Sequence, residues 1–147
     1  MSLLSAADQD HLREAFAQLT RSVHLIFFTQ TFGCETCAET RRILDELPPL
    51  SDKIHIDEVN NVLEPDRAKS YGIDRAPAIV LAYEDPSGAV IDTRIRFLGA
   101  PSGYEFISLV QAVLLVGGRP SSLTAEQRQR LAGVATPVTM QVFTTPT

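Results

Sequence analysis

The sequence predicts an α/β protein with a central four-stranded mixed sheet, helices on both faces, and a helix before the first strand. Two observations lead to this fold class. Short apolar segments rich in β-branched and aromatic residues alternate with amphipathic helical patterns over residues 1–117. The third and fourth of these segments flank a turn sequence, DPSG at 85–88, which predicts an antiparallel pair.

Helical periodicity and capping residues define five expected helices. Ser5 with Asp8 three residues later is a capping pattern, and apolar residues at helical spacing follow it. Ser102 with Glu105 opens a later helix in the same way, and prolines at 48–49 end another because proline cannot continue a helix. The expected helices span residues 6–20, 34–47, 65–71, 102–117 and 125–132.

Five short segments have the composition of strands. They are rich in Val, Ile and Phe, and several alternate apolar with polar residues, as expected of a half-buried strand. The first, VHLIFF, is apolar on both faces, which predicts a central strand covered on both sides. The expected strands span residues 23–28, 53–59, 78–83, 90–98 and 138–143.

These elements divide the chain into two regions. Residues 1–117 hold a complete α-β-α-β-α-β-β-α domain, whereas residues 118–147 hold only a linker helix and one strand. That strand, VTMQVFT at 138–144, matches VHLIFFT at 23–29 at three of seven positions, an agreement that chance produces about as readily as duplication. If the repeat is real, the sequence stops where a second, truncated unit begins.

Charge and hydropathy exclude several classes of function. The 147 residues include 13 basic and 18 acidic side chains, a net charge of −5, with no basic cluster, so we expect no nucleic-acid partner. No apolar segment reaches the roughly 18 residues that span a bilayer, and MSLLS at the start lacks a secretory-signal pattern. We expect no membrane association and a cytoplasmic location.

Cys34 and Cys37 are the two cysteines of the sequence, and they form a C-x-x-C motif at the expected start of a helix. This spacing brings the Cα atoms to about 5–6 Å, which suits an unstrained disulfide. The helix N-terminus favours a thiolate at Cys34, because its free N–H groups and dipole stabilise negative charge. We expect Cys34 to attack a disulfide and Cys37, one turn inside the helix, to resolve the mixed disulfide.

Other interpretations of this pair remain open. A zinc site would need a second pair, which the sequence lacks, and its three histidines show no ligand spacing. Two chains can share an iron–sulfur cluster, and the two cysteines can also be inert core residues. We favour a redox pair without metal or cofactor. Glu35 would oppose thiolate formation if it points at Cys34, and Arg75 would favour it if its loop folds over the site.

The order of these motifs resembles that of the thioredoxin/glutaredoxin superfamily: a strand, C-x-x-C at a helix, and a proline directly before the third strand. The resemblance implies a thioredoxin-like fold in which Pro77 is cis and packs against the disulfide. It also implies that Ala76 offers backbone groups to an extended substrate segment. Arg75 is a further expected substrate contact. Phe32 is either an exposed contact of this kind or an aromatic that packs locally.

The resemblance covers essentially the whole chain. Segments LLSAAD (3–8), YGIDRAP (71–77) and FLGAPSGYEF (97–106) are similar to the N-terminal unit of the tandem protein disulfide oxidoreductases, glutaredoxin-like proteins with two thioredoxin folds. TTPT at 144–147 resembles the lead into the second C-x-x-C of that family. This similarity supports the interpretation that a second unit begins after residue 117.

Three departures limit what the resemblance implies. The dipeptide Glu-Thr at 35–36 is typical of neither thioredoxins nor glutaredoxins, so no redox potential carries over. Phe28 replaces the buried acid of thioredoxins, so that proton route is absent. The tripeptide Arg-Ala-Pro at 75–77 replaces the Thr-Val-Pro of glutathione-using glutaredoxins, which argues against glutathione dependence.

The function implied is that of a thiol–disulfide oxidoreductase acting on protein disulfides, with a thioredoxin-reductase-like electron donor as a further partner. One alternative is an accessory docking or electron-relay module, like the related N-terminal region of alkyl hydroperoxide reductase flavoproteins. A less favoured alternative is an iron–sulfur-binding glutaredoxin-like protein.

The strand at 138–143 has no place in the first unit, so we expect it to be mobile or to join a sheet edge, including that of a second chain in a homodimer.

Overall fold

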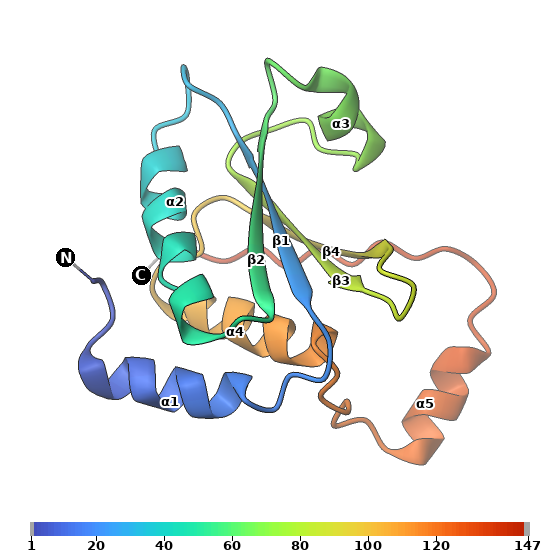
Figure 1. Ribbon diagram of the computed structural model, residues 1–147. Coiled ribbons are helices and arrows are strands. Elements are labelled where there is room, and N and C mark those ends of the chain that lie inside the picture. Colours follow the sequence, from blue (N-terminus) through green and yellow to red (C-terminus); the bar gives the residue numbers. More distant parts are fainter. Residues whose placement is uncertain (1, 146–147) are drawn as a thin grey trace.

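The computed structural model describes residues 2–145, and in them a four-stranded sheet carries helices on both faces (Figure 1). The helices are α1 (Ala6–Phe16), α2 (Cys37–Asp45), the 3-10 turn η1 (Pro48–Leu50), α3 (Pro65–Ser70), α4 (Tyr104–Val116) and α5 (Ala125–Ala132). The strands are β1 (Val23–Thr29), β2 (Ile54–Asn60), β3 (Ala78–Glu84) and β4 (Val90–Leu98). The strand order is β2-β1-β3-β4. β1 is parallel to β2, and the other two pairs are antiparallel. The predicted fold class is confirmed.

β1 lies at the centre of the sheet because both of its faces are apolar. Val23, Leu25 and Phe27 face the larger core, which α1, α2 and α4 cover. Ile26 and Phe28 face a smaller core on the other side, which α3 covers. All five side chains are at most 1% exposed. The continuous apolar pattern of the VHLIFF segment therefore predicted the correct place in the sheet.

α2 begins later than the sequence analysis expected. Its first residue is Cys37 and its N-cap is Thr36, so Cys34 lies outside the helix in the turn that precedes it. The expectation that Cys37 lies one turn inside the helix is wrong. The disulfide closes residues 34–37 into a tight loop, and the first helical hydrogen bond runs from the Thr40 N–H to the Thr36 carbonyl at 2.9 Å.

α4 is not capped by the expected Ser102–Glu105 capping box. Its N-cap is Gly103, which has a positive φ of 59° and provides no side-chain cap. Because glycine readily adopts this conformation, the helix starts one residue later than the capping pattern suggests. The Glu105 carboxylate instead accepts a hydrogen bond from the Thr144 hydroxyl.

The expected strand at 138–143 is not formed. α5 has the expected capping box between Thr124 and Gln127, but it buries none of its residues. The segment that follows pairs with no strand of the described residues, and Met140 and Phe143 are 87% and 90% exposed. A β-strand needs a partner for its backbone hydrogen bonds, and residues 2–145 provide none at this position.

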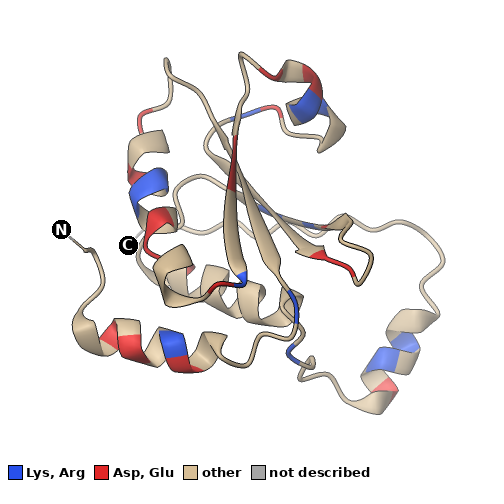
Figure 2. Ribbon diagram, viewed as in Figure 1, with Lys and Arg blue, Asp and Glu red and all other residues tan. Residues whose placement is uncertain are grey.

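Charged side chains of both signs are mixed over the surface of the helices (Figure 2). Several pair within one helix, as Arg13 does with Asp10 in α1 and Arg41 with Asp45 in α2. Within residues 2–145, no helix has both the length and the apolar character needed to cross a bilayer.

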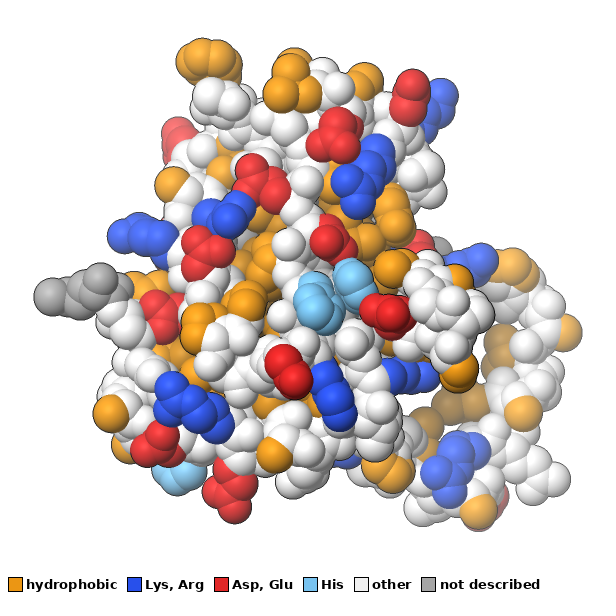
Figure 3. Space-filling view, in the orientation of Figure 1, with side chains coloured by type: hydrophobic (Ala, Val, Ile, Leu, Met, Phe, Trp, Pro, Cys, Tyr) orange, Lys and Arg blue, Asp and Glu red, His pale blue; other side chains and the backbone are white. Residues whose placement is uncertain are grey.

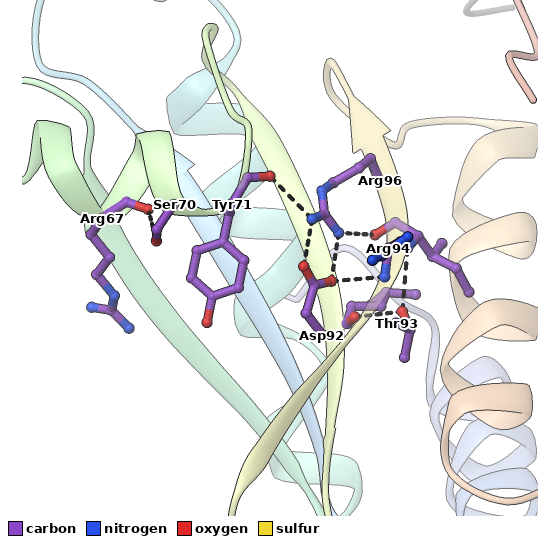
Figure 4. Close-up of polar contacts among 9 residues, drawn as sticks. Arg67, Ser70, Tyr71, Asp92, Thr93, Arg94 and Arg96 are labelled. Carbon is purple, nitrogen blue, oxygen red and sulfur yellow. Dashed lines mark hydrogen bonds and ion pairs between the residues drawn. The ribbon is translucent and has the colours of Figure 1, made fainter. Parts of the chain in front are cut away.

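Arg96 joins the edge strand β4 to the end of α3 (Figure 4). Its guanidinium donates to both carboxylate oxygens of Asp92, at 2.8 and 2.7 Å, and to the backbone carbonyl of Tyr71 at 3.1 Å. Between the two charged residues, Arg94 adopts a positive φ of 64° where the β3–β4 register shifts, and its N–H donates to Asp92 at 2.7 Å. The Arg96–Asp92 pair thus fixes an irregular edge strand.

Asp92→Asn should destabilise the protein in a pH-dependent way. The Arg96 hydrogen bonds hold the pKa of Asp92 below its ordinary value of 3.8, so the fold favours the charged carboxylate. This contribution is present above pH 3.8 and is lost as the pH falls through the lower pKa of the folded state. We expect D92N to lower the free energy of urea unfolding by about 2 kcal/mol at pH 7 and by progressively less in acid. A deficit that does not change with pH would contradict this assignment, and Asp10→Asn, at an exposed pair, is the control.

Leu109→Ala should cost about 3 kcal/mol of unfolding free energy, because Leu109 is fully buried in the larger core. Leu131→Ala on α5, where the side chain is 56% exposed, should cost less than about 0.5 kcal/mol. Chemical denaturation of both variants measures the difference. Equal losses would mean that α5 belongs to the same cooperative core.

Candidate functional site

Cys34 and Cys37 form a disulfide across the turn that opens α2, with their Cα atoms 5.5 Å apart. Cys37 is 6% exposed and belongs to the larger core, whereas Cys34 is half-buried and packs against the edge of that core. Cys34 is therefore the more accessible of the two residues. This asymmetry suits a pair in which one sulfur meets a partner and the other stays inside.

The sheet topology brings three loops to the end that holds the disulfide. β1 ends at Thr29, and the chain reaches Cys34 five residues later. Asn60, the register partner of Thr29, ends β2 at the same edge. Ala78 at the start of β3 pairs with Phe28, so the loop before β3 also enters there. These loops lie at the top of Figure 1, near the start of α2.

The loop before β3 contains a cis peptide bond between Ala76 and Pro77, as the resemblance implied. Pro77 is buried, and its carbonyl accepts a hydrogen bond from the Gly99 N–H at 2.9 Å. Ala76 is half-buried and packs against the same core as the two cysteines. Within residues 2–145, neither the N–H nor the carbonyl of Ala76 has a hydrogen-bond partner. Both backbone groups therefore remain free to pair with another chain.

Arg75 directs its charge to its own neighbour. The guanidinium donates to the Asp74 carboxylate at 2.8 and 3.3 Å, and this hydrogen bond lowers the pKa of Asp74. Both side chains are mostly exposed. The main-chain carbonyl of Arg75, by contrast, accepts a hydrogen bond from the Asn61 side chain at 3.2 Å. The fold thus fixes the backbone of this loop, and the charge of Arg75 is already compensated.

Phe32 does not pack locally, because its side chain is 86% exposed. Glu35, between the two cysteines, is exposed and pairs with no cation within residues 2–145. Two further residues at this end were missed in the sequence analysis: Val62 and Leu63, in the turn after β2, are 71% and 79% exposed. An apolar pair inside a polar loop was the available signal.

A second group of titratable residues lies on the α3 side of the sheet. The Nδ1 atom of His24 is 2.7 Å from Asp57, its Nε2 atom is 3.5 Å from Glu84, and its ring lies 5.0 Å from that of His55. Figure 3 shows a pair of histidines beside acidic side chains. Within residues 2–145, no group of three or more His, Cys, Asp or Glu side chains is arranged to hold a metal ion.

No model of a known family matches the sequence. The chain is 39% identical over 94 residues to the alkyl hydroperoxide reductase protein AhpF of Xanthomonas campestris pv. phaseoli, a match that covers 62% of the chain and 15% of that protein. The solved AhpF of Enterococcus faecalis matches with a TM-score of 0.75 and 32% identity, over 88% of this chain and 60% of that one. A protein disulfide oxidoreductase from Aeropyrum pernix matches with a TM-score of 0.73 and 21% identity, over 88% and 54%.

The fold and the Cys34–Cys37 pair define a redox unit of the thioredoxin/glutaredoxin superfamily. Within that class, the chain is similar in sequence and in structure to the alkyl hydroperoxide reductase protein AhpF, and in fold to the protein disulfide oxidoreductase. The chain spans one fifth or less of the length of the curated relatives it matches.

Arg75→Ala should change the reactivity of Cys34 little, because Asp74 compensates the guanidinium charge. We expect the alkylation rate of the reduced protein at pH 7 to stay within about twofold of wild type. Glu35→Gln, which removes an unpaired carboxylate between the cysteines, should instead accelerate alkylation. Slowing by more than about fivefold in R75A would show that the guanidinium acts on the thiolate.

Proposed function

We propose that the chain is a thiol–disulfide oxidoreductase unit that exchanges disulfides with polypeptide partners. One observation carries this proposal: the accessible Cys34, with Cys37 buried behind it, lies at the same end of the sheet as the unpaired backbone groups of Ala76. A reactive sulfur and a free strand-like backbone are what an extended substrate segment requires. The similarity to oxidoreductases of the same superfamily supports a redox role.

In the reducing direction, the Cys34 thiolate attacks one sulfur of a partner disulfide. The partner's S–S bond breaks, its second sulfur leaves as a thiolate and takes up a proton, and a Cys34–partner disulfide forms. The Cys37 thiolate then attacks Cys34, releases the first partner thiol and restores the Cys34–Cys37 disulfide. Two electrons pass to the partner, and the reverse sequence oxidises a partner dithiol. α2 begins at Cys37, so its free N–H groups support a thiolate at the preceding turn.

Substrate binding is assigned to the loops around this pair. The N–H and carbonyl of Ala76 would pair with an extended partner segment, and the Pro77 carbonyl that follows is held by the Gly99 N–H. Arg75 contributes through its carbonyl, which Asn61 holds in place. Phe32 offers an exposed apolar surface two residues before Cys34. These roles are proposals that the geometry supports.

Residues 1–117 would form the working domain, and residues 118–147 would lead into a second thioredoxin-like unit. Two observations support this division: α5 buries none of its residues, and Val138, Met140 and Phe143 expose apolar side chains that a following domain or a second chain would cover. A reductase-type electron donor and a reducing, cytoplasmic compartment complete the proposal, because the disulfides that form in such a compartment are usually transient and catalytic.

An accessory role is the second candidate. The sequence similarity to the alkyl hydroperoxide reductase protein AhpF favours a docking or electron-relay module whose turnover depends on the rest of a longer protein. Activity that appears only when the longer protein is assayed would favour this candidate over the first.

The isolated chain should reduce a model protein disulfide when dithiothreitol is supplied. Cys34→Ser should abolish the activity, because it removes the attacking sulfur. Cys37→Ser should accumulate a mixed disulfide at Cys34, which mass spectrometry of the unreduced protein detects. Activity in C34S equal to wild type would overturn the assignment of Cys34 as the nucleophile.

A further inference from the structure

Val62 and Leu63 place two adjacent aliphatic side chains in solvent at the end of the molecule that carries the disulfide. They are 71% and 79% exposed, in the turn between β2 and α3. Figure 3 shows apolar side chains standing out at this end, where the β1–α2 and β2–α3 loops lie. An exposed aliphatic pair at the end that carries the disulfide is available for contact with a partner.

The turn is held rigidly by Asn60 and Glu64. The side-chain oxygen of Asn60 accepts hydrogen bonds from the N–H groups of Val62 and Leu63, at 3.0 and 3.1 Å. The carbonyl of Asn60 accepts from the Glu64 N–H at 2.7 Å, and the Glu64 carboxylate accepts from the Asn60 N–H at 3.3 Å. These bonds fix the backbone of the turn, and the two aliphatic side chains are held outward.

Asn61 connects this turn to the site. Its N–H donates to the carbonyl of Thr29 at 2.8 Å, at the end of the strand that leads to Cys34. Its side-chain amide donates at 3.2 Å to the carbonyl of Arg75, the residue before Ala76. One asparagine thus fixes the apolar turn both to the end of β1 and to the residue before Ala76, whose backbone we assign to substrate pairing.

Two cations near the turn are paired with carboxylates close to them in the sequence. Arg67 lies 3.4 Å from Glu64, and Arg75 lies 2.8 Å from Asp74. These two cations are therefore committed to neighbouring carboxylates and offer little to an anionic partner. The combination of a fixed apolar pair and two paired cations fits an uncharged aliphatic segment better than a small anionic disulfide such as oxidised glutathione.

We propose that Val62 and Leu63 are specificity residues that contact aliphatic side chains flanking the reactive cysteine of a polypeptide disulfide. The proposal rests on the proposed function, and it names the substrate class of the same site. A segment that pairs with Ala76 would pass beside the turn anchored by Asn61, and burial of the aliphatic contacts would stabilise the encounter complex. The chemistry at the cysteines is unchanged.

The test uses the full chain with dithiothreitol as the reductant and three disulfides. One is a disulfide-linked peptide with Leu on both sides of each cysteine, the second has Ser at those positions, and the third is hydroxyethyl disulfide, which has no flanking residues. We expect wild type to reduce the Leu peptide with a kcat/KM about tenfold above that of the Ser peptide. The double variant V62S/L63S should lose about tenfold on the Leu peptide and stay within about twofold on the other two disulfides.

A matched control replaces one Leu and one Val elsewhere on the surface. Leu131 and Val134, in and just after α5, are 56% and 55% exposed. L131S/V134S should leave all three rates unchanged. Failure of wild type to reduce any of the three disulfides would overturn the proposed function itself. Equal wild-type rates on both peptides, unchanged rates in V62S/L63S, or a loss in V62S/L63S that is equal for all three disulfides would overturn the specificity role and leave the redox function in place.

Discussion

The burial of β1 on both faces is the constraint from which the rest of the structure follows. Phe27 packs into one core and Phe28 into the other, so helices must cover both faces of the sheet at β1. The strand lies inside the sheet, between β2 and β3. β2 and β3 pair with it in opposite directions, so the end of β1 meets the end of β2 and the beginning of β3. Three segments meet at this end because β1 ends there: the loop with Cys34 and Cys37, the turn that contains Asn61, and the loop with the cis Ala76–Pro77 bond.

The properties of the site follow from that meeting point. Cys37 starts α2 and is buried against the main core, whereas Cys34 precedes the helix and keeps access to solvent. Asn61 and Gly99 hydrogen-bond the backbone on either side of Ala76 and leave Ala76 itself unpaired. The site therefore depends on backbone positioning and apolar contact more than on charge.

The local pattern of apolar and polar residues was sufficient to predict those strands whose burial follows from their own residues. The apolar segments predicted β1 and β3 to within one residue, and β4 matched the expected bounds of 90–98. The errors arose where a distant or covalent constraint decides. α2 begins at Cys37, after the turn that the disulfide closes, Gly103 with its positive φ takes the place of the Ser102 cap, and the segment 138–143 lacks a partner strand among the described residues. Part of the site could also be predicted, because the spacing of the cysteines and the position of Pro77 are properties of the sequence. The ion pair that compensates the charge of Arg75 with Asp74 depends on side-chain geometry, so the sequence alone did not predict it. In the sequence, Val62 and Leu63 stand out only as an apolar pair inside a polar segment, and the structure shows by their exposure and by the hydrogen bonds of Asn60 that they are held in solvent.

The proposed chemistry requires the Cys34–Cys37 disulfide to be a reversible redox pair rather than a structural crosslink. The decisive measurement is equilibration of the chain in thiol–disulfide buffers of graded potential, followed by alkylation and mass counting of free thiols. A reversible pair should show one two-electron transition at a potential above about −300 mV, with both thiols appearing together. A pair that stays oxidised in buffers well below about −300 mV would behave as a structural disulfide and would contradict the proposed chemistry.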